Sequence, residues 1–317
     1  MKNVILLIIT ILAAGCQPAQ EKSLEAVISN EFITAKLDLP DAEHGYYRGS
    51  RFDWTGVMPE LKYEGHEYFG VWFKHYDPHL HDAICGPVEE FMALGYDEAP
   101  VGGEFLRIGI GGLRKPSEEA FSRFGYYELV NPGKWTVKKE PNSVLFTHVL
   151  KDAAGYSYEY QKEVVLTEGK AQLVLKHTLK NTGTKAIKTQ AYNHNFFTID
   201  CQPVGPGVMV KFPFPLDTAI RHPALNVTGQ LMEYIAVPEG AVQFVDFKGL
   251  GNRVEDYDFS IENKNTRAGV RITGDKPVVK IVYWSSELTQ CPEPYIDIIA
   301  APGETFSWTT TYDFYVF

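Results

Sequence analysis

Short runs of alternating apolar and polar residues, each closed by turn residues, constrain the fold of this chain more than any other feature. The clearest run covers residues 172–180 and ends at Asn-Thr-Gly-Thr (181–184), and a second run follows at residues 187–192. A period of two is typical of a strand with one buried face, and Asn and Gly favour tight turns. Long stretches of helical periodicity are absent. The pattern therefore predicts an all-β sandwich or barrel.

The same pattern predicts the extent of individual strands and of the domain. Residues 28–39, 135–150 and 156–166 are each predicted to form one strand. Glu64-Gly65 indicates a hairpin turn within residues 61–69. Because no change in composition marks a second domain, residues 28–317 are predicted to fold as one large unit.

The N-terminal segment predicts export. Lys2 is followed by an apolar run over residues 4–12, which is too short to span a bilayer because a spanning helix takes about 20 residues. Ala13-Ala-Gly-Cys16 resembles a bacterial lipobox, which implies a signal peptide over residues 1–15, lipid on Cys16 and a tether over residues 16–27. We therefore expect an exported lipoprotein that is anchored to a membrane on its periplasmic or cell-surface side. A plain secretory signal is the alternative.

The charge balance bears on possible partners. The chain carries 30 Lys and Arg against 40 Asp and Glu, a formal net charge of −10, and it has no basic cluster. Nucleic acids and other anionic polymers bind to concentrated positive charge. The composition therefore argues against nucleic acid as a partner.

Four cysteines occur, at positions 16, 85, 201 and 291. If Cys16 is lipidated, three remain, so the chain can form at most one internal disulfide. Cys201 and Cys291 lie close in sequence to the motifs described below, which favours them as the pair. The alternative is three buried thiols, because core cysteines are common.

A histidine between two asparagines provides the first candidate site. His194 can gain or lose a proton near neutral pH, and the flanking amides of Asn193 and Asn195 can hydrogen-bond hydroxyl groups. The aromatic rings of Phe196 and Phe197 suit the apolar face of a sugar ring. The segment therefore predicts a carbohydrate site, with a structural histidine at a corner of a sheet as the alternative.

A glutamate between two prolines provides the second candidate. The segment Cys-Pro-Glu-Pro-Tyr at 291–295 holds Glu293 in a restricted backbone, which we expect at the edge of a sheet. A carboxylate fixed in this way can act as a positioned base. The alternative is an ordinary glutamate on a proline-rich turn.

Basic residues in the first third of the chain provide further candidates. Arg48 and Arg51 can each donate several hydrogen bonds to ligand oxygens, although a surface ion pair is the commoner role of an arginine. His79 and His81 are two residues apart, so a strand would place them on one face, where two imidazoles can serve as metal ligands. No third, distant ligand is evident, so we expect neither a metal nor another cofactor.

Together these segments resemble the aldose 1-epimerase (galactose mutarotase-like) superfamily. The resemblance is carried, in order along the chain, by Gly49-Ser-Arg51 with His79-Leu-His81, the strand ending in Asn181-Thr-Gly183, His194-Asn-Phe-Phe197, residues 291–295, and Ala301-Pro-Gly-Glu-Thr-Phe306 with Thr310-Thr-Tyr-Asp-Phe314. Two of these segments depart from the family pattern: Asp82-Ala83 replaces Gly-Gly, and Phe196 and Thr198 replace tyrosine and asparagine.

The resemblance implies a large antiparallel β-sandwich and roles for individual residues. Glu293 matches the general base and His194 the general acid, whereas Arg51 and His81 match residues that orient the substrate. Asp256 matches a sugar-binding aspartate by its distance from Phe259, and Asn193 is a further substrate-binding candidate.

These residue types suit the opening and closing of a pyranose ring. A base takes the proton of the anomeric hydroxyl and an acid protonates the ring oxygen, with no metal or cofactor needed. We therefore expect an enzyme that interconverts the α and β anomers of a free sugar, with a nearby carboxylate that keeps His194 protonated. The alternatives are a lipoprotein that binds a mono- or oligosaccharide without catalysis, and a lyase or another epimerase on the same fold.

Overall fold

A computed structural model of the chain describes residues 24–216, 221–245, 247 and 250–317. The expected signal peptide, Cys16 and most of the expected tether lie outside these residues. The first strand begins at Glu25, so regular structure starts three residues before the predicted boundary at residue 28.

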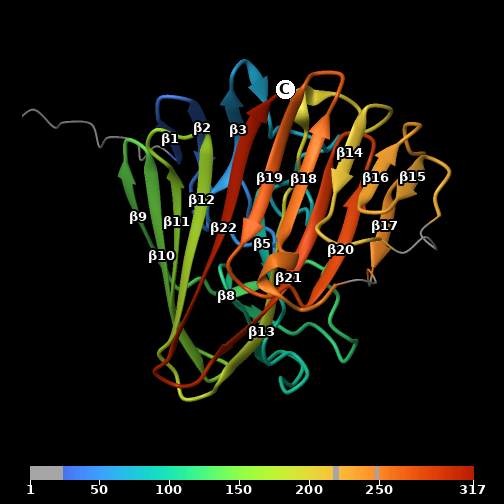
Figure 1. Cartoon of the computed structure of the whole chain (residues 1–317). Coiled ribbons are helices and arrows are strands. Elements are labelled where there is room, and N and C mark those ends of the chain that lie inside the picture. The colour runs from blue at the N-terminus through green and yellow to red at the C-terminus, as the bar shows by residue number, and fades with distance from the viewer. Residues whose placement is uncertain (1–23, 217–220, 246, 248–249) are drawn as a thin grey trace, which may run out of the picture.

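The described part of the chain forms four antiparallel sheets (Figure 1). The largest has ten strands in the order β15 (Leu225–Thr228), β16 (Leu231–Tyr234), β14 (Val208–Lys211), β18 (Asp258–Asn263), β19 (Ala268–Gly274), β22 (Thr305–Val316), β12 (Gln172–Asn181), β11 (Tyr156–Leu166), β10 (Ser143–Ala153) and β9 (Lys134–Glu140). A five-stranded sheet lies behind it in Figure 1, in the order β17 (Val242–Val245), β20 (Lys280–Ser285), β21 (Gln290–Ala300), β13 (Ile187–His194) and β5 (Val88–Phe91).

Two smaller sheets complete the fold. One contains β1 (Glu25–Ser29), β2 (Ile33–Asp38), β3 (Val57–Tyr63) and β4 (His66–Glu67), and the other β6 (Glu104–Arg107), β7 (Gly111–Arg114) and β8 (Leu129–Asn131). The helical segments of the described residues are the single turns η1 (Ile199–Cys201) and η2 (Val254–Asp256). No helix within the described ranges is long and apolar enough to cross a membrane. The large antiparallel β-sandwich expected from the sequence is confirmed.

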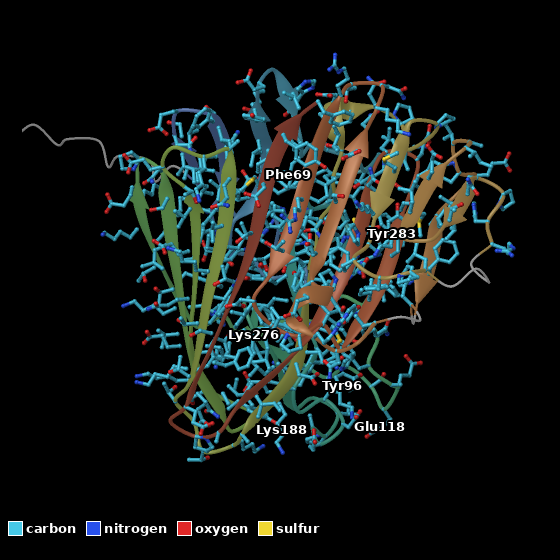
Figure 2. The ribbon with its side chains drawn as sticks, viewed as in Figure 1. Phe69, Tyr96, Glu118, Lys188, Lys276 and Tyr283 are labelled. Carbon is cyan, nitrogen blue, oxygen red and sulfur yellow. The ribbon has the colours of Figure 1, made fainter. Side chains whose placement is uncertain are left out.

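The core lies between the two large sheets because each presents one apolar face. Along β12, Leu173, Leu175 and Leu179 are buried together with His177, whereas the residues that alternate with them are partly or fully exposed. These leucines belong to the same buried cluster as Ile296 and Ile298 of β21. Figure 2 shows the contrast, with Phe69 and Tyr283 inside the sandwich and Lys188 at its lower edge. Burial of the apolar faces, at about 25 cal/mol per Å², is the main force that holds the layers together.

Two of the predicted strands are hairpins instead. Residues 28–39 are divided between β1 and β2, because the Asn30 side chain accepts hydrogen bonds from the N–H groups of Phe32 and Ile33 and so closes a turn. Residues 135–150 are divided between β9 and β10 at Pro141-Asn142. Alternation within the two arms of a tight hairpin resembles one long strand, which explains both errors. The strand predicted over residues 156–166 is confirmed as β11.

The register of the five-stranded sheet brings distant segments together. β13 pairs with β21 so that Ile187 lies opposite Ala300 and Tyr192 opposite Tyr295. Continued by two residues, this register places His194 opposite Glu293. The two candidates meet because they occupy matching positions on neighbouring antiparallel strands.

The proline pair around Glu293 does not lie at a sheet edge, contrary to the sequence-based expectation. β21 is an interior strand between β20 and β13. Its ladder with β13 ends at Tyr295, so Pro292 and Pro294 stand where the two strands diverge. There the missing N–H groups of the prolines cost no hydrogen bonds with β13.

Candidate active site

A cavity of about 140 Å³ opens where β13 and β21 diverge. Its lining consists of ionisable side chains (Arg51, His81, Asp82, Arg123, His194 and Glu293), aromatic side chains (Trp72, Phe124, Phe196 and Trp284) and the amide of Gln243. A volume of roughly 150 Å³ accommodates one six-membered ring. The cavity therefore matches a single sugar unit in size and in its mixture of aromatic and polar walls.

Glu293 and His194 are in direct contact in this cavity. Nε2 of His194 lies 3.2 Å from Oε1 of Glu293, and both side chains are buried. Nδ1 of His194 has no hydrogen-bond partner among the described residues. The carboxyl and the imidazole are therefore placed to share one proton.

The corner after β13 fixes the histidine ring. Phe196 adopts a φ of 45°, a value uncommon for a residue with a side chain, and its N–H donates to Sγ of Cys291 at 3.1 Å. The turn lays the Phe196 ring flat on the His194 ring, with 3.7 Å between centroids and 8° between planes. Phe52 and Trp284 approach the same imidazole edge-on. Three aromatic neighbours therefore hold His194 in one orientation.

The apolar surroundings decide the protonation of this pair. Burial raises the pKa of Glu293 to about 8, even though Arg51 and Arg123 act in the opposite direction. Burial, followed by the same two arginines, lowers the pKa of His194 well below its usual value of 6.5. At neutral pH the pair therefore carries one shared proton and no net charge. The expectation that a carboxylate keeps His194 protonated is wrong for the free protein, because burial and the two arginines lower the pKa of His194 while burial leaves Glu293 protonated at neutral pH.

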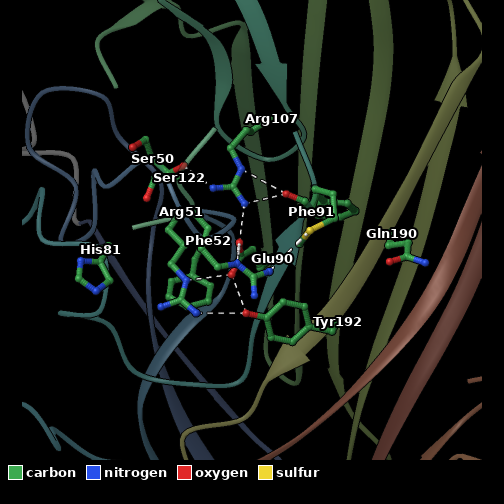
Figure 3. Close-up of polar contacts among 12 residues, drawn as sticks. Ser50, Arg51, Phe52, His81, Glu90, Phe91, Arg107, Ser122, Gln190 and Tyr192 are labelled. Carbon is green, nitrogen blue, oxygen red and sulfur yellow. Dashed lines mark hydrogen bonds and ion pairs between the residues drawn. The ribbon is translucent and has the colours of Figure 1, made fainter. Parts of the chain in front are cut away.

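Arg51 is held by a buried carboxylate beneath the cavity (Figure 3). Glu90 of β5 accepts hydrogen bonds from Arg51 and Arg107 at 2.8 Å each, from Arg123 at 3.0 Å and from the hydroxyl of Tyr192 at 2.6 Å. Three guanidinium groups lower the pKa of Glu90 to about 2 despite its burial. The carboxylate of Glu90 thus fixes two arginines of the cavity wall, Arg51 and Arg123. Because three guanidinium groups surround this one carboxylate, the cluster has an excess of positive charge.

Asn193 supports a separate network instead of lining the cavity. Its Nδ2 donates to Glu89 at 2.8 Å, and Glu89 also contacts Lys162 at 2.5 Å and His177 at 2.9 Å. Glu89 and Glu90 are consecutive in β5, so their side chains point to opposite faces of the sheet. Asn193, the residue before His194, therefore stabilises a hydrogen-bond network in the interior of the sandwich.

Asp256 also lies away from the cavity lining. Its carboxylate forms an ion pair with Arg253 at 2.8 Å and accepts the backbone N–H of Gly251 at 2.6 Å, which closes the loop around η2. His81 does line the cavity, where its Nε2 lies 3.5 Å from Asp82. The structure thus brings together Glu293, His194, Arg51 and His81, but neither Asn193 nor Asp256.

Several cavity residues were not identified from the sequence. Arg123, Trp72, Trp284 and Gln243 come from four separate segments, and none belongs to the motifs discussed above. The sequence Ser-Arg-Phe-Gly at 122–125 repeats the Ser-Arg-Phe that contains Arg51, and this similarity was the one available signal. Trp72 and Gln243 have no comparable signal, because only the packing of their segments shows that they face the cavity.

The described residues contain no group of three or more His, Cys, Asp or Glu side chains that could hold a metal ion. Cys85, Cys201 and Cys291 are free thiols, so the pairing of Cys201 with Cys291 is wrong. The alternative of three buried thiols holds for Cys85 and Cys291, whereas Cys201 is exposed.

Comparison with known proteins identifies the fold. No protein-family model and no curated protein matches the chain. Among solved structures, a protein from Synechocystis sp. PCC 6803 has a TM-score of 0.56 and 13% identity, over 98% of this chain and 100% of its own. A galactose mutarotase-like protein from Lactobacillus casei ATCC 334 has a TM-score of 0.52 and 12% identity, over 92% and 100%. An aldose epimerase homologue from C. elegans has a TM-score of 0.51 and 12% identity, over 92% and 98%.

These similarities extend over nearly the whole of both chains, although few residues are identical. The suspected resemblance therefore holds at the level of the backbone. The chain has the fold of the aldose 1-epimerase and galactose mutarotase-like proteins.

Proposed function

We propose that this chain is an aldose 1-epimerase-like enzyme that interconverts the α and β anomers of a free sugar. The observation that carries the proposal is the contact of 3.2 Å between Glu293 and His194 in a cavity of ring size. The hydroxyl oxygen and the ring oxygen involved in ring opening are bonded to the same carbon. Groups that serve both oxygens must therefore be neighbours, as these two residues are.

In ring opening, and again in ring closure, the pair of Glu293 and His194 takes up one proton and releases one proton. One member takes the proton from the anomeric hydroxyl while the other gives a proton to the ring oxygen, the carbon–oxygen bond of the ring breaks, and an aldehyde forms. Rotation of the aldehyde and the reverse transfers close the ring in the other configuration. Because Arg51 and Arg123 are fixed by Glu90, they can orient the sugar oxygens without a change of position.

The pH dependence of the reaction follows from the shared proton. The pair can act as both acid and base only while it holds exactly one transferable proton, so we expect kcat/KM to fall as the pH rises through about 8, where Glu293 loses that proton. A second decline is expected on the acid side, well below pH 6.5, where His194 takes up a second proton. Polarimetry across this range, corrected for catalysis by the buffer, measures both limbs. An activity that instead increases through pH 8 would mean that Glu293 acts alone as a base.

The direct test of the proposed function is polarimetry on a panel of freshly dissolved aldoses. The enzyme should accelerate the approach to anomeric equilibrium for at least one sugar. A protein that binds sugars but accelerates none is a non-catalytic binding protein. The replacement of the family's tyrosine and asparagine by Phe196 and Thr198 would then account for the loss of activity.

We also propose that the protein is an exported lipoprotein, attached to a membrane through lipid on Cys16. The support is the sequence of residues 1–16, an apolar run followed by small residues and a cysteine. Cys16→Ala should move the protein from the membrane fraction to the soluble fraction, as measured by immunoblotting after fractionation. Wild-type protein that is already soluble after export would contradict the anchor.

A further inference from the structure

A second hollow lies directly beside the candidate cavity. It has a volume of about 500 Å³, and Trp72 and Asp82 line both spaces. By the ring-size measure used above, it has room for more than one further sugar unit. The candidate cavity is therefore the narrow end of a longer groove.

We propose that this groove binds the second sugar unit of an oligosaccharide whose reducing end occupies the candidate cavity. That the reducing end is the part held in the cavity rests on the proposed function. The groove itself follows from the shared walls and from the chemistry of its lining.

The aromatic wall of the groove is rigid. The ring of Trp72 stacks on Phe196 with 5.0 Å between centroids and 15° between planes, and its Nε1 donates to the carbonyl of Ile84 at 2.9 Å. Phe73 packs edge-on against Trp72 at 5.9 Å and remains partly exposed in the groove. Fixed aromatic faces bind the C–H face of a sugar at a small cost in conformational entropy.

The polar part of the groove has free hydrogen-bonding groups. The side chains of Lys74, His75 and Glu287 are exposed in the groove, and none makes a hydrogen bond or ion pair with another described residue. They supply donors and acceptors within reach of the same aromatic wall. Lys74 stands against two carboxylates, those of Asp82 and Glu287, so the groove has no excess of positive charge for a phosphate. Aromatic faces beside polar groups without excess positive charge match a hydroxyl-rich chain.

Calorimetric titration of the full-length mature protein tests the proposal. The probes are glucose, maltose and maltotriose, which share a reducing-end glucose, and galactose with β-1,4-galactobiose. We expect one of these series to show a disaccharide that binds about tenfold more tightly than its monosaccharide, equivalent to about 1.4 kcal/mol. Phe73→Ala and His75→Ala should each remove several-fold of this advantage and leave monosaccharide affinity unchanged.

A second variant and a matched control separate an effect on sugar binding from an effect on folding. His75→Ala removes an exposed imidazole, so it preserves the fold even if Phe73→Ala loosens Trp72, and thermal melting identifies that case. Phe32→Ala is the matched control, because Phe32 is an exposed aromatic residue on the turn between β1 and β2 and should alter no sugar affinity.

The possible outcomes separate the groove from the proposed function. A disaccharide that binds no more tightly than its monosaccharide, or an advantage that survives both substitutions, overturns the groove, as does a lack of binding to all five sugars. Polarimetry on the same samples reports on the enzyme independently. Accelerated mutarotation without a length preference contradicts the groove alone, whereas length-dependent binding without acceleration supports the groove and contradicts the enzyme.

Discussion

Glu293→Gln should lower the rate of anomer interconversion by about 10²–10⁴-fold while the affinity for the sugar is retained. The substitution preserves the size and the hydrogen-bonding capacity of the side chain but removes its ability to exchange a proton. His194 would lose the partner that lies 3.2 Å away and with it the shared proton. Polarimetry gives the rate and calorimetry the affinity, and both should be measured on the same preparation.

His194→Asn should reduce the rate to a similar extent, and the double variant should be little slower than either single variant. The reason is that both residues act in one proton-transfer step, so removal of one disables the other. Glu163→Gln is the matched control, since it makes the same chemical change on the outer face of β11. Losses that multiply in the double variant would show that the two residues act separately. If Glu293→Gln lowers the sugar affinity as much as it lowers the rate, Glu293 only binds the sugar and takes no part in proton transfer.

Glu90→Gln should destabilise the protein by about 3–5 kcal/mol, the usual cost of removing one partner from a buried ion pair. Glu90 is fully buried, and its carboxylate is the common partner of Arg51, Arg107 and Arg123. A neutral amide would leave three guanidinium groups close together, of which Arg107 is also fully buried, without a compensating charge. Urea unfolding measures the change, and sugar affinity should fall with it because Arg51 and Arg123 lose their anchor.

The control for this substitution is again Glu163→Gln, which breaks a surface ion pair with Lys176 and should cost at most about 1 kcal/mol. The pH dependence provides a second check. Because the pKa of Glu90 is about 2 in the folded protein and higher in the unfolded chain, its contribution is complete above the unfolded pKa and is lost as the pH falls towards 2. The stability difference between wild type and Glu90→Gln should therefore shrink below pH 4.5. A difference of less than 1 kcal/mol at pH 7 would show that the arginines are compensated elsewhere.

Part of the candidate site was predictable because local sequence restricts it. Pro292 and Pro294 limit the backbone around Glu293, and His194 ends a strand that follows a turn signal in the sequence. The partners of Arg51 were not predictable in this way. Val-Glu-Glu-Phe in β5 has two adjacent acidic residues, which in isolation suggest an exposed segment, yet all four residues are buried. Their burial depends on Lys162, Arg107 and Arg123, which lie far away in the chain.

The periodicity of the sequence by itself determined the all-β class, because a period of two between turn residues specifies strands with one apolar face whatever their order in the sheet. Only the tertiary structure decided which polar residues face the cavity and which of them carry a proton at neutral pH. Asn193 points to Glu89 and away from the cavity because adjacent strand residues face opposite sides of a sheet. Glu293 retains a proton at neutral pH, and His194 lacks its charge, because burial by residues distant in sequence removes both from water. Desolvation depends on everything packed around a group, so the order of residues along the chain does not reveal it.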